Sequence, residues 1–184
     1  MLDMRRLNLR SSAHHEAGHA VAAVLLGLSF EKVWIHRRGE NEPIPQGAKL
    51  GELTRNPPIQ KAAFAGNLEE AKKEAIQALA GPIAECLAYP DEFGPDWNLN
   101  VNDVEDAKSV LRFAIVSYTE SNGRPIWDEA DLRSKAPILQ RALQECDQAA
   151  GQHVIKNRTT IEKIAAELLE RWELSAEEAR ALCQ

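Results

Sequence analysis

Two histidines and a glutamate fall within five residues near the start of the chain, in the order His15-Glu16-Ala17-Gly18-His19. If this stretch is helical, residues 15 and 19 lie one turn apart and about 40° apart around the helix axis. Both imidazoles can then bind one metal ion, at about 2.0–2.1 Å in the case of zinc. The spacing therefore predicts a metal-binding turn, and the pattern HExxH is typical of zinc-dependent peptide hydrolysis.

Glu16 would lie beside the metal, where its carboxylate can act as the general base on a metal-held water. Zinc lowers the pKa of such a water to about 7, which makes hydroxide available for attack on a peptide carbonyl. The mid-helix Gly18 costs about 1 kcal/mol relative to alanine, which indicates close approach of another backbone or of substrate. His14 points about 100° away and is expected to be a bystander or a hydrogen-bond donor to a ligand. The alternative is a helix with two core histidines and a chance glutamate.

A third ligand is needed, because catalytic zinc takes three protein ligands and keeps one position open. The extended pattern HExxHxxGxxH is absent, since Ala22 and Leu25 stand at its Gly and His positions. The ligand must come from another segment, and the candidate carboxylates include Glu70, Glu74, Glu85, Asp91, Asp96, Asp103 and Asp106. Asp103 begins a predicted helix after a long loop, where a side chain can point into a cleft, but the same position would suit a simple helix-capping carboxylate.

Hydrophobic periodicity predicts the elements that must position these residues. A helix over residues 12–26 carries the motif, begun by Ser11 or Ser12 and ended at Gly27. Alternation predicts strands over residues 30–36 and 48–54. Further helices are predicted from Asn67 to a break at Gly81-Pro82, from Pro82 to Tyr89, from Asp103 to Tyr118, and after Pro137 with breaks near Arg158 and Leu174. Ser175 and Glu178 form a capping box before the last helix, residues 90–102 are a long polar loop, and residues 122–125 are a turn.

The fold class expected from this pattern is mainly α, with a small β-hairpin or sheet near residues 30–54. A length of 184 residues favours a single domain over 1–184, with an active-site part (11–118) and a C-terminal helical part (126–184). A formal charge of -6 and scattered cationic residues argue against nucleic-acid and anionic-membrane partners. Three separated cysteines and no apolar leader or spanning segment predict a cytoplasmic protein without disulfides.

The motif and the segments that follow it resemble the peptidase domain of the FtsH family, the membrane-anchored ATP-dependent zinc proteases. The similar segments are HEAGHAV, the strand-like AKLGELT at 48–54, the helix start Ala80-Gly81-Pro82-Ile83-Ala84-Glu85, Asn102-Asp103 and the C-terminal helices 153–169 and 174–182. The resemblance implies a helical zincin-type fold over roughly residues 12–184. It further implies that Zn²⁺ is the cofactor, bound by His15, His19 and Asp103.

The resemblance also assigns other roles. Glu16 becomes the general base, Glu85 a carboxylate near the metal, and Leu50, Gly51 and Glu52 part of the strand that pairs with extended substrate. Three departures from the family pattern are Pro82 in place of an arginine, Cys86 in place of a glutamate, and the missing Thr-Gly element before Asn102-Asp103. Because this approach to Asp103 is built differently, Asp106 and Asp96 remain alternative ligands.

The chain contains no G-x-x-x-x-G-K-[ST] loop, and neither the family's ATPase module nor its membrane helices are recognised in it. The sequence therefore predicts a zinc endopeptidase that cleaves flexible or unfolded polypeptides without ATP, or that works with a separate ATPase partner. Hexameric rings in the family imply a homo-oligomer. A catalytically silent peptidase-fold module that docks a partner is the alternative function, and a structural zinc site ranks behind both because no cysteine lies near the motif.

Overall fold

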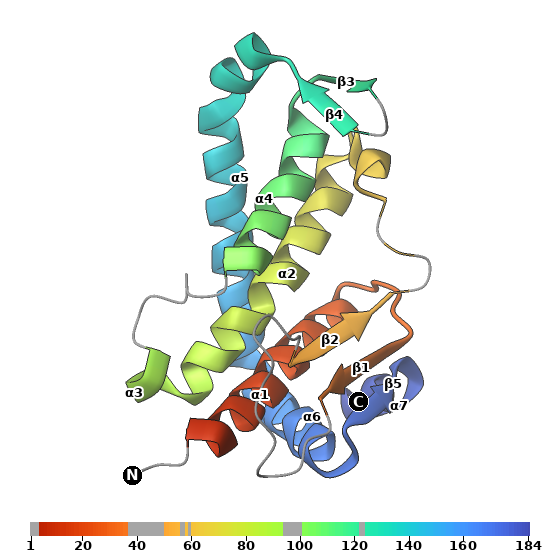
Figure 1. The fold of residues 1–184 in the computed structure, drawn as a ribbon, viewed down its shortest axis with the longest axis vertical. Helices are drawn as coiled ribbons and strands as arrows, with labels where there is room; N and C mark the ends of the chain where they lie inside the picture. The colour runs from red at the N-terminus through yellow and green to blue at the C-terminus, as the bar shows by residue number, and fades with distance from the viewer. Residues whose placement is uncertain (1–3, 37–49, 56–57, 59, 94–100, 122–123) are drawn as a thin grey trace.

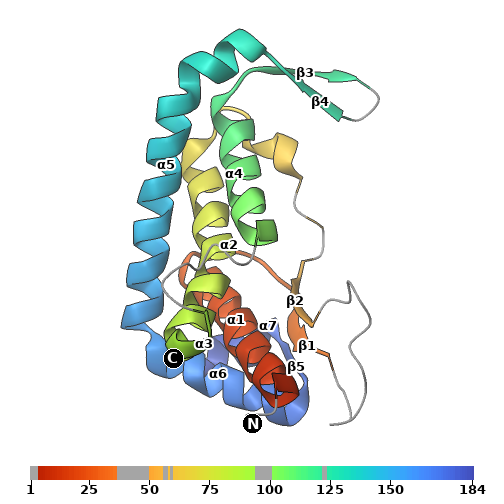
Figure 2. The same cartoon turned by 60° about the vertical axis from the view of Figure 1, so that its left-hand side comes forward.

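The computed structural model describes residues 4–36, 50–55, 58, 60–93, 101–121 and 124–184 and is mainly helical, as the sequence predicts (Figure 1). The helices are α1 (Met4–Leu25), α2 (Leu68–Ala88), α3 (Pro90–Phe93), α4 (Val101–Ile115), α5 (Glu129–Lys156), α6 (Arg158–Arg171) and α7 (Ala176–Leu182), with a 3-10 turn, η1 (Lys61–Phe64). Helices α2, α4 and α5 run side by side, while α1, α6 and α7 gather at the opposite end from the paired strands β3 (Tyr118–Ser121) and β4 (Arg124–Trp127) (Figures 1 and 2).

The three-stranded sheet has the order β2-β1-β5 and is antiparallel throughout. Its strands are β1 (Lys32–Ile35), β2 (Gly51–Thr54) and β5 (Glu173–Ser175). The register places Trp34 opposite Glu52 on one side of β1 and opposite Glu173 on the other. Strand β2 therefore lies at the edge of the described sheet, and β1 and β2 confirm the two predicted strands.

The core is built largely from small residues where α1 meets α2. Ala13, Ala17 and Ala20 on α1 are fully buried, as are several alanines of α2. At Gly18 a Cβ atom would lie 2.6 Å from the Ala80 carbonyl oxygen and 2.7 Å from the Ala84 Cβ. The expected close approach at this glycine is thus confirmed, and the neighbour is the backbone of α2.

Two predicted helix boundaries near the motif and its neighbouring helix are wrong. Helix α1 begins at Met4 rather than at a serine cap, so Ser11 and Ser12 are buried within it one turn before the motif. Helix α2 continues through Gly81 and Pro82 instead of ending there. Proline removes one backbone hydrogen bond from a helix, but Pro82 is fully buried and α1 packs directly beside it at Ala80 and Ala84, which stabilises the uninterrupted helix.

The remaining predictions near the ends of elements have mixed outcomes. Asn67 caps α2 through the Glu70 amide, Gly27 has a φ of +69° after α1, and the capping box before α7 is present. In contrast, α4 ends at Ile115 and not at Tyr118, and β3 (Tyr118–Ser121) and β4 (Arg124–Trp127) were not predicted. Of the predicted turn, residues 122–123 lie outside the described residues and 124–125 begin β4. Helix α5 begins at Glu129 and continues through Pro137. Strand β5 was also missed, because three residues carry too short a pattern to recognise. Residues 94–100 of the predicted long loop lie outside the described residues, and 90–93 form α3.

Replacing Gly18 with alanine is expected to destabilise the protein. The new methyl would meet the Ala80 carbonyl, which cannot move without displacing α2, and such overpacking costs about 1–3 kcal/mol. Gly151→Ala is the matched control, since Gly151 lies within α5 and a Cβ added there would meet no neighbouring atom within 4 Å; there alanine should add up to about 1 kcal/mol through helix propensity. Urea unfolding midpoints measure both effects, and equal shifts in the two variants would contradict the prediction.

Candidate metal centre

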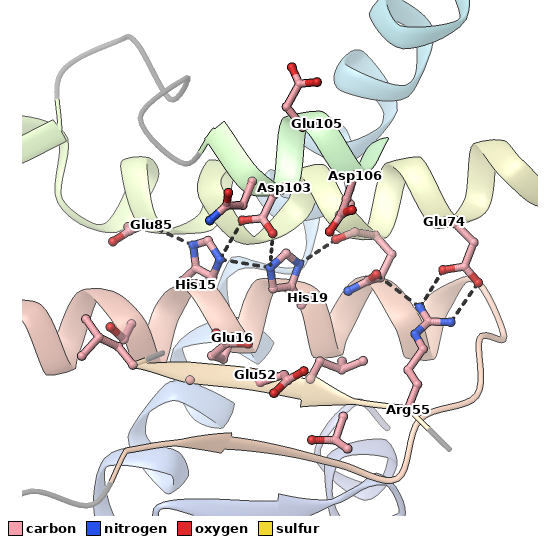
Figure 3. Close-up of a pocket in the computed structure, with 18 of the residues that line it drawn as sticks. His15, Glu16, His19, Glu52, Arg55, Glu74, Glu85, Asp103, Glu105 and Asp106 are labelled. Atoms are coloured by element: carbon pink, nitrogen blue, oxygen red, sulfur yellow. Dashed lines mark hydrogen bonds and ion pairs between the residues drawn. The ribbon is translucent and has the colours of Figure 1, made fainter. Parts of the chain in front are cut away.

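One turn of α1 presents the three residues of the motif on the wall of a cleft. His15, Glu16 and His19 are each 6–7% exposed. The cleft measures about 1140 Å³ and is lined by residues of α1, β2, α2 and α4. Figure 3 shows α1 in the middle, with β2 on one side and α2 and α4 on the other. The motif therefore faces a space large enough for a peptide segment rather than a closed core.

Both imidazoles are oriented by α2. The Nδ1 of His19 donates to the backbone carbonyl of Gln77 at 2.8 Å. The Nδ1 of His15 lies 3.0 Å from the Glu85 carboxylate. A hydrogen bond at Nδ1 selects the tautomer whose Nε2 carries a lone pair, which is how metal-binding histidines are commonly held. The structure places Glu85 against His15, and its role beside a metal stays a prediction.

The Nε2 atoms converge with the carboxylate of Asp103 from α4. The two Nε2 atoms are 3.0 Å apart, and Asp103 lies 3.1 Å from that of His15 and 3.8 Å from that of His19. Two ligand atoms on a tetrahedral zinc ion are separated by about 3.3 Å, given bonds of about 2.0–2.1 Å. His15, His19 and Asp103 thus form a group that could hold a metal ion, and their donor atoms fit zinc.

Room for this group depends on Gly81. A Cβ at that position would lie 2.4 Å from the His19 Nε2 and 2.5 Å from its Cε1. No side chain other than hydrogen fits there while the imidazole keeps this orientation. The glycine that the sequence pattern presented as a helix break therefore makes space for a predicted ligand.

The other candidate carboxylates named here form ion pairs away from the histidines, are exposed, or lie outside the described residues. Asp106 pairs with Lys61 at 2.7 Å and its side chain is 64% exposed. Glu74 pairs with Arg55, and Glu70 with Lys73. Asp91 is exposed on α3, and Asp96 lies among residues that the structure does not describe. Of the candidates that are described, Asp103 alone joins the two histidines.

Burial and neighbouring charges shift the pKa values of His15, His19 and Asp103. Burial by itself lowers the pKa of His15, but its contacts with Asp103 and Glu85 and the charge of Glu16 raise that pKa to about 10. Burial, reinforced by the neighbouring His15, lowers the pKa of His19 to about 4. Burial opposes ionisation of Asp103, yet both histidines hold its pKa below the usual range. Without a metal, the site therefore keeps a positive charge on His15, in the place a cation would take.

Glu16 is pressed against the edge strand. A Cβ at Gly51 would lie 2.6 Å from the Glu16 Cγ and 2.8 Å from the Trp34 carbonyl oxygen. The Glu16 Oε2 is buried and makes no hydrogen bond to any described residue, and burial raises the pKa of this carboxyl to about 8. Leu50, Gly51 and Glu52 line the same cleft as Glu16. The structure thus brings the predicted base next to the predicted substrate strand.

His14 does not join the group. Its Nδ1 donates to the Arg10 carbonyl at 2.9 Å, and its ring meets the edge of Tyr89 at 5.3 Å between centroids. The residues that sequence reasoning missed are Gln77, Gly81 and Arg55. A backbone carbonyl such as that of Gln77 leaves no signal in residue type, whereas the glycine was visible and was assigned to a helix break.

Metal binding is expected to tighten with pH. His15, whose pKa is raised above its unfolded value, stabilises the metal-free fold below about pH 6.5, and this contribution is lost as pH rises toward about 10. Zinc must displace that proton, so the stabilisation by zinc should grow by about 1.4 kcal/mol per pH unit for each proton displaced. Thermal unfolding with and without ZnCl₂ should show a difference in midpoint that widens from pH 6 to pH 8. A constant or narrowing difference would contradict the assignment.

Comparisons with known proteins point to one group of relatives. No protein-family model matches the chain. It is 25% identical over 177 residues to the ATP-dependent zinc metalloprotease FtsH 2 of Thermoanaerobacter sp. (strain X514), covering 93% of this chain and 32% of that protein. It is 30% identical over 195 aligned positions to FtsH 1 of Rhodopirellula baltica, covering 93% and 27%, and 25% identical to FtsH 4 of Sorangium cellulosum, covering 94% and 28%.

The chain therefore spans less than a third of the length of the curated relatives it matches. In the part that the structure describes, none of the helices combines the length and hydropathy needed to cross a membrane. Some 93% of this chain is distantly similar to a segment of the FtsH-type ATP-dependent zinc metalloproteases. That segment makes up about 30% of the length of each relative, which is the extent expected of the peptidase domain alone.

Proposed function

We propose that the chain is a zinc-dependent endopeptidase that hydrolyses peptide bonds in flexible or unfolded polypeptides. The observation that carries this proposal is the convergence of His15 Nε2, His19 Nε2 and the Asp103 carboxylate beside the buried Glu16 on the wall of an open cleft. The distant similarity to zinc metalloproteases supports it.

In this proposal His15, His19 and Asp103 hold the zinc ion, and Glu85 and Gln77 orient the two imidazoles through their Nδ1 atoms. Zinc, when bound, supplies a Lewis acid that polarises the scissile carbonyl and acidifies water. The two α2 contacts hold both rings with their Nε2 atoms facing one point, so a metal would need to displace only the proton of His15.

Glu16 acts as the general base. Glu16 belongs to the lining of the cleft, and its Oε2 is buried without a hydrogen bond to a described residue. The carboxylate could accept a proton from the attacking water and pass it to the leaving amine. Burial raises its pKa to about 8 in the metal-free protein, which makes the carboxylate more basic than an exposed glutamate. A nearby cation favours the ionised form, so the base is available near neutral pH.

The substrate would bind along β2. This strand pairs with β1 on one side and lies at the edge of the described sheet on the other. An extended peptide can add to such an edge through main-chain hydrogen bonds. Leu50, Gly51 and Glu52 would then face the substrate backbone, and Gly51 allows the strand to pass directly over Glu16.

Zinc analysis and proteolysis of the purified chain test the proposal together. Elemental analysis should give one zinc per chain, and the protein should cleave casein, a flexible substrate, without added ATP. Removal of zinc with a chelator should stop cleavage, and stoichiometric ZnCl₂ should restore it. One zinc per chain with no turnover of casein, with or without a separate ATPase, would instead favour a module that docks a partner.

A further inference from the structure

A buried ion pair lies among the residues that line the cleft. Arg55, the residue directly after β2, places its Nη1 2.8 Å from Glu74 Oε1 and its Nη2 2.8 Å from Glu74 Oε2. Both side chains are only 10% exposed, and both residues belong to the lining of the cleft. The Nη1 contact is a hydrogen bond, whereas the Nη2 contact is an ion pair without a hydrogen bond to Glu74 Oε2. Together the two contacts restrict the orientation of the guanidinium as well as its distance from the carboxylate. The pair thus ties the end of β2 to α2 (Figure 3).

The same guanidinium reaches the residue that orients a proposed zinc ligand. Its Nη2 donates to the side-chain oxygen of Gln77 at 3.2 Å, one helical turn from Glu74. The backbone oxygen of Gln77 accepts the hydrogen bond from His19 Nδ1. The strand at the substrate edge and the helix behind the metal group are therefore linked through one arginine.

The other described contacts of β2 join it to the sheet, to α1 and to the core. Its pairing with β1 fixes its place beside that strand, and Thr54 receives a hydrogen bond from Trp34 of the same sheet. Outside the sheet, Gly51 of β2 packs on Glu16 of α1, and Leu53 packs against the hydrophobic core. Arg55 is the described residue next to β2 that forms an ion pair with α2, so its contact acts on the separation between β2 and α2 at this end.

We propose that Arg55 is a positioning residue, which fixes the separation between the β2 backbone and the α2 wall and thereby pre-orders the cleft for an extended peptide. This inference rests on the proposed peptidase function for its kinetic consequence. Arg55 reaches His19 through Gln77 and not directly, so one zinc per chain should still bind when Arg55 is replaced. A pre-ordered strand lowers the entropy cost of substrate binding, so its loss should appear in KM more than in kcat.

The test compares Arg55→Met with the double variant Arg55→Met/Glu74→Met. The double variant is included because Arg55→Met alone leaves a buried carboxylate without its partner. Both are expected to raise KM for an extended peptide about tenfold while kcat stays within about threefold. Arg55→Lys, which keeps the charge but not the two-point contact, should give an intermediate KM. Zinc should remain at one per chain throughout.

Hydrogen exchange provides a readout that does not depend on catalysis. Amides of residues 51–54 should exchange at least about tenfold faster in the double variant, with α1 and α2 unchanged. Lys32→Met is the matched control, since Lys32 forms an exposed ion pair with Glu173 between β1 and β5 of the same sheet; it should leave KM and the exchange of residues 51–54 unchanged.

Several outcomes would overturn the proposal. These are wild-type KM and wild-type exchange at 51–54 in the double variant, equal effects in Lys32→Met, or loss of zinc from the double variant. If the parent protein cleaves no peptide at all, the proposed function fails, but faster exchange confined to residues 51–54 still supports the role of Arg55 in holding β2.

Discussion

Glu16→Gln should retain one zinc per chain while cleavage of casein falls by about 10²–10⁴-fold, the range associated with losing a general base. The amide has the shape of the carboxylate but cannot accept a proton from water. The substitution leaves the contacts of His15, His19 and Asp103 with one another and with α2 unaltered. It also suits the buried position, because burial already favours the neutral form of this side chain. Binding of zinc and loss of turnover should therefore separate cleanly.

Elemental analysis and a casein assay measure the two properties of Glu16→Gln. Glu105→Gln is the control, since it removes a carboxylate from the rim of the same cleft, where Glu105 pairs with Lys108. That variant should cleave casein at the parental rate. Parental activity in Glu16→Gln would refute the catalytic assignment, and loss of zinc from it would show that the carboxylate serves the metal rather than the proton transfer.

Gly81→Ala should reduce zinc affinity by at least about 10–100-fold, the range seen when a residue that orients a metal ligand is changed. The added methyl would lie 2.4 Å from the His19 Nε2, so the imidazole must rotate away from His15 and Asp103. The variant should still fold, since alanine favours the helix over glycine by about 1 kcal/mol, and the atoms that must give way belong to one side chain.

Competition with a chromogenic zinc chelator measures the affinity of Gly81→Ala, and circular dichroism verifies its helix content. Proteolysis should fall in proportion to zinc occupancy and recover partly at high zinc concentration. Gly151→Ala, which places a methyl in open space on α5, should bind zinc as the parent does. An unchanged affinity in Gly81→Ala would mean that His19 does not bind zinc in this orientation.

Local sequence suffices for part of the fold. The helical class, the two strands at 32–35 and 51–54 and the capping box at Ser175 and Glu178 follow from patterns within a few residues. The Gly81-Pro82 pair shows where such patterns fail. Both residues disfavour a helix locally, yet α2 continues because α1 packs against this stretch. Packing between elements outweighed propensity, which a single stretch of sequence cannot reveal.

In the candidate site, too, local sequence predicted some features and packing between elements decided the others. The spacing of His15, Glu16 and His19 predicted that they share one face of a helix, and the structure places them there, although their roles in binding and catalysis remain predictions. Among several carboxylates that local reasoning could not distinguish, the structure brings Asp103 to the histidines and pairs Asp106 with Lys61. A short helix repeat specifies neighbours within one element, but it does not say which residue of another element will face them.

The sequence by itself determined the residue chemistry, which is a pair of imidazoles one turn apart with a carboxylate beside them. Tertiary structure decided the rest: that α4 brings Asp103, that a carbonyl of α2 orients His19, that Gly81 leaves room for its ring, and that Arg55 holds the edge strand in place. The physical reason is that helix geometry is set by hydrogen bonds between residues four apart, whereas these contacts depend on how α1, α2, α4 and β2 pack together.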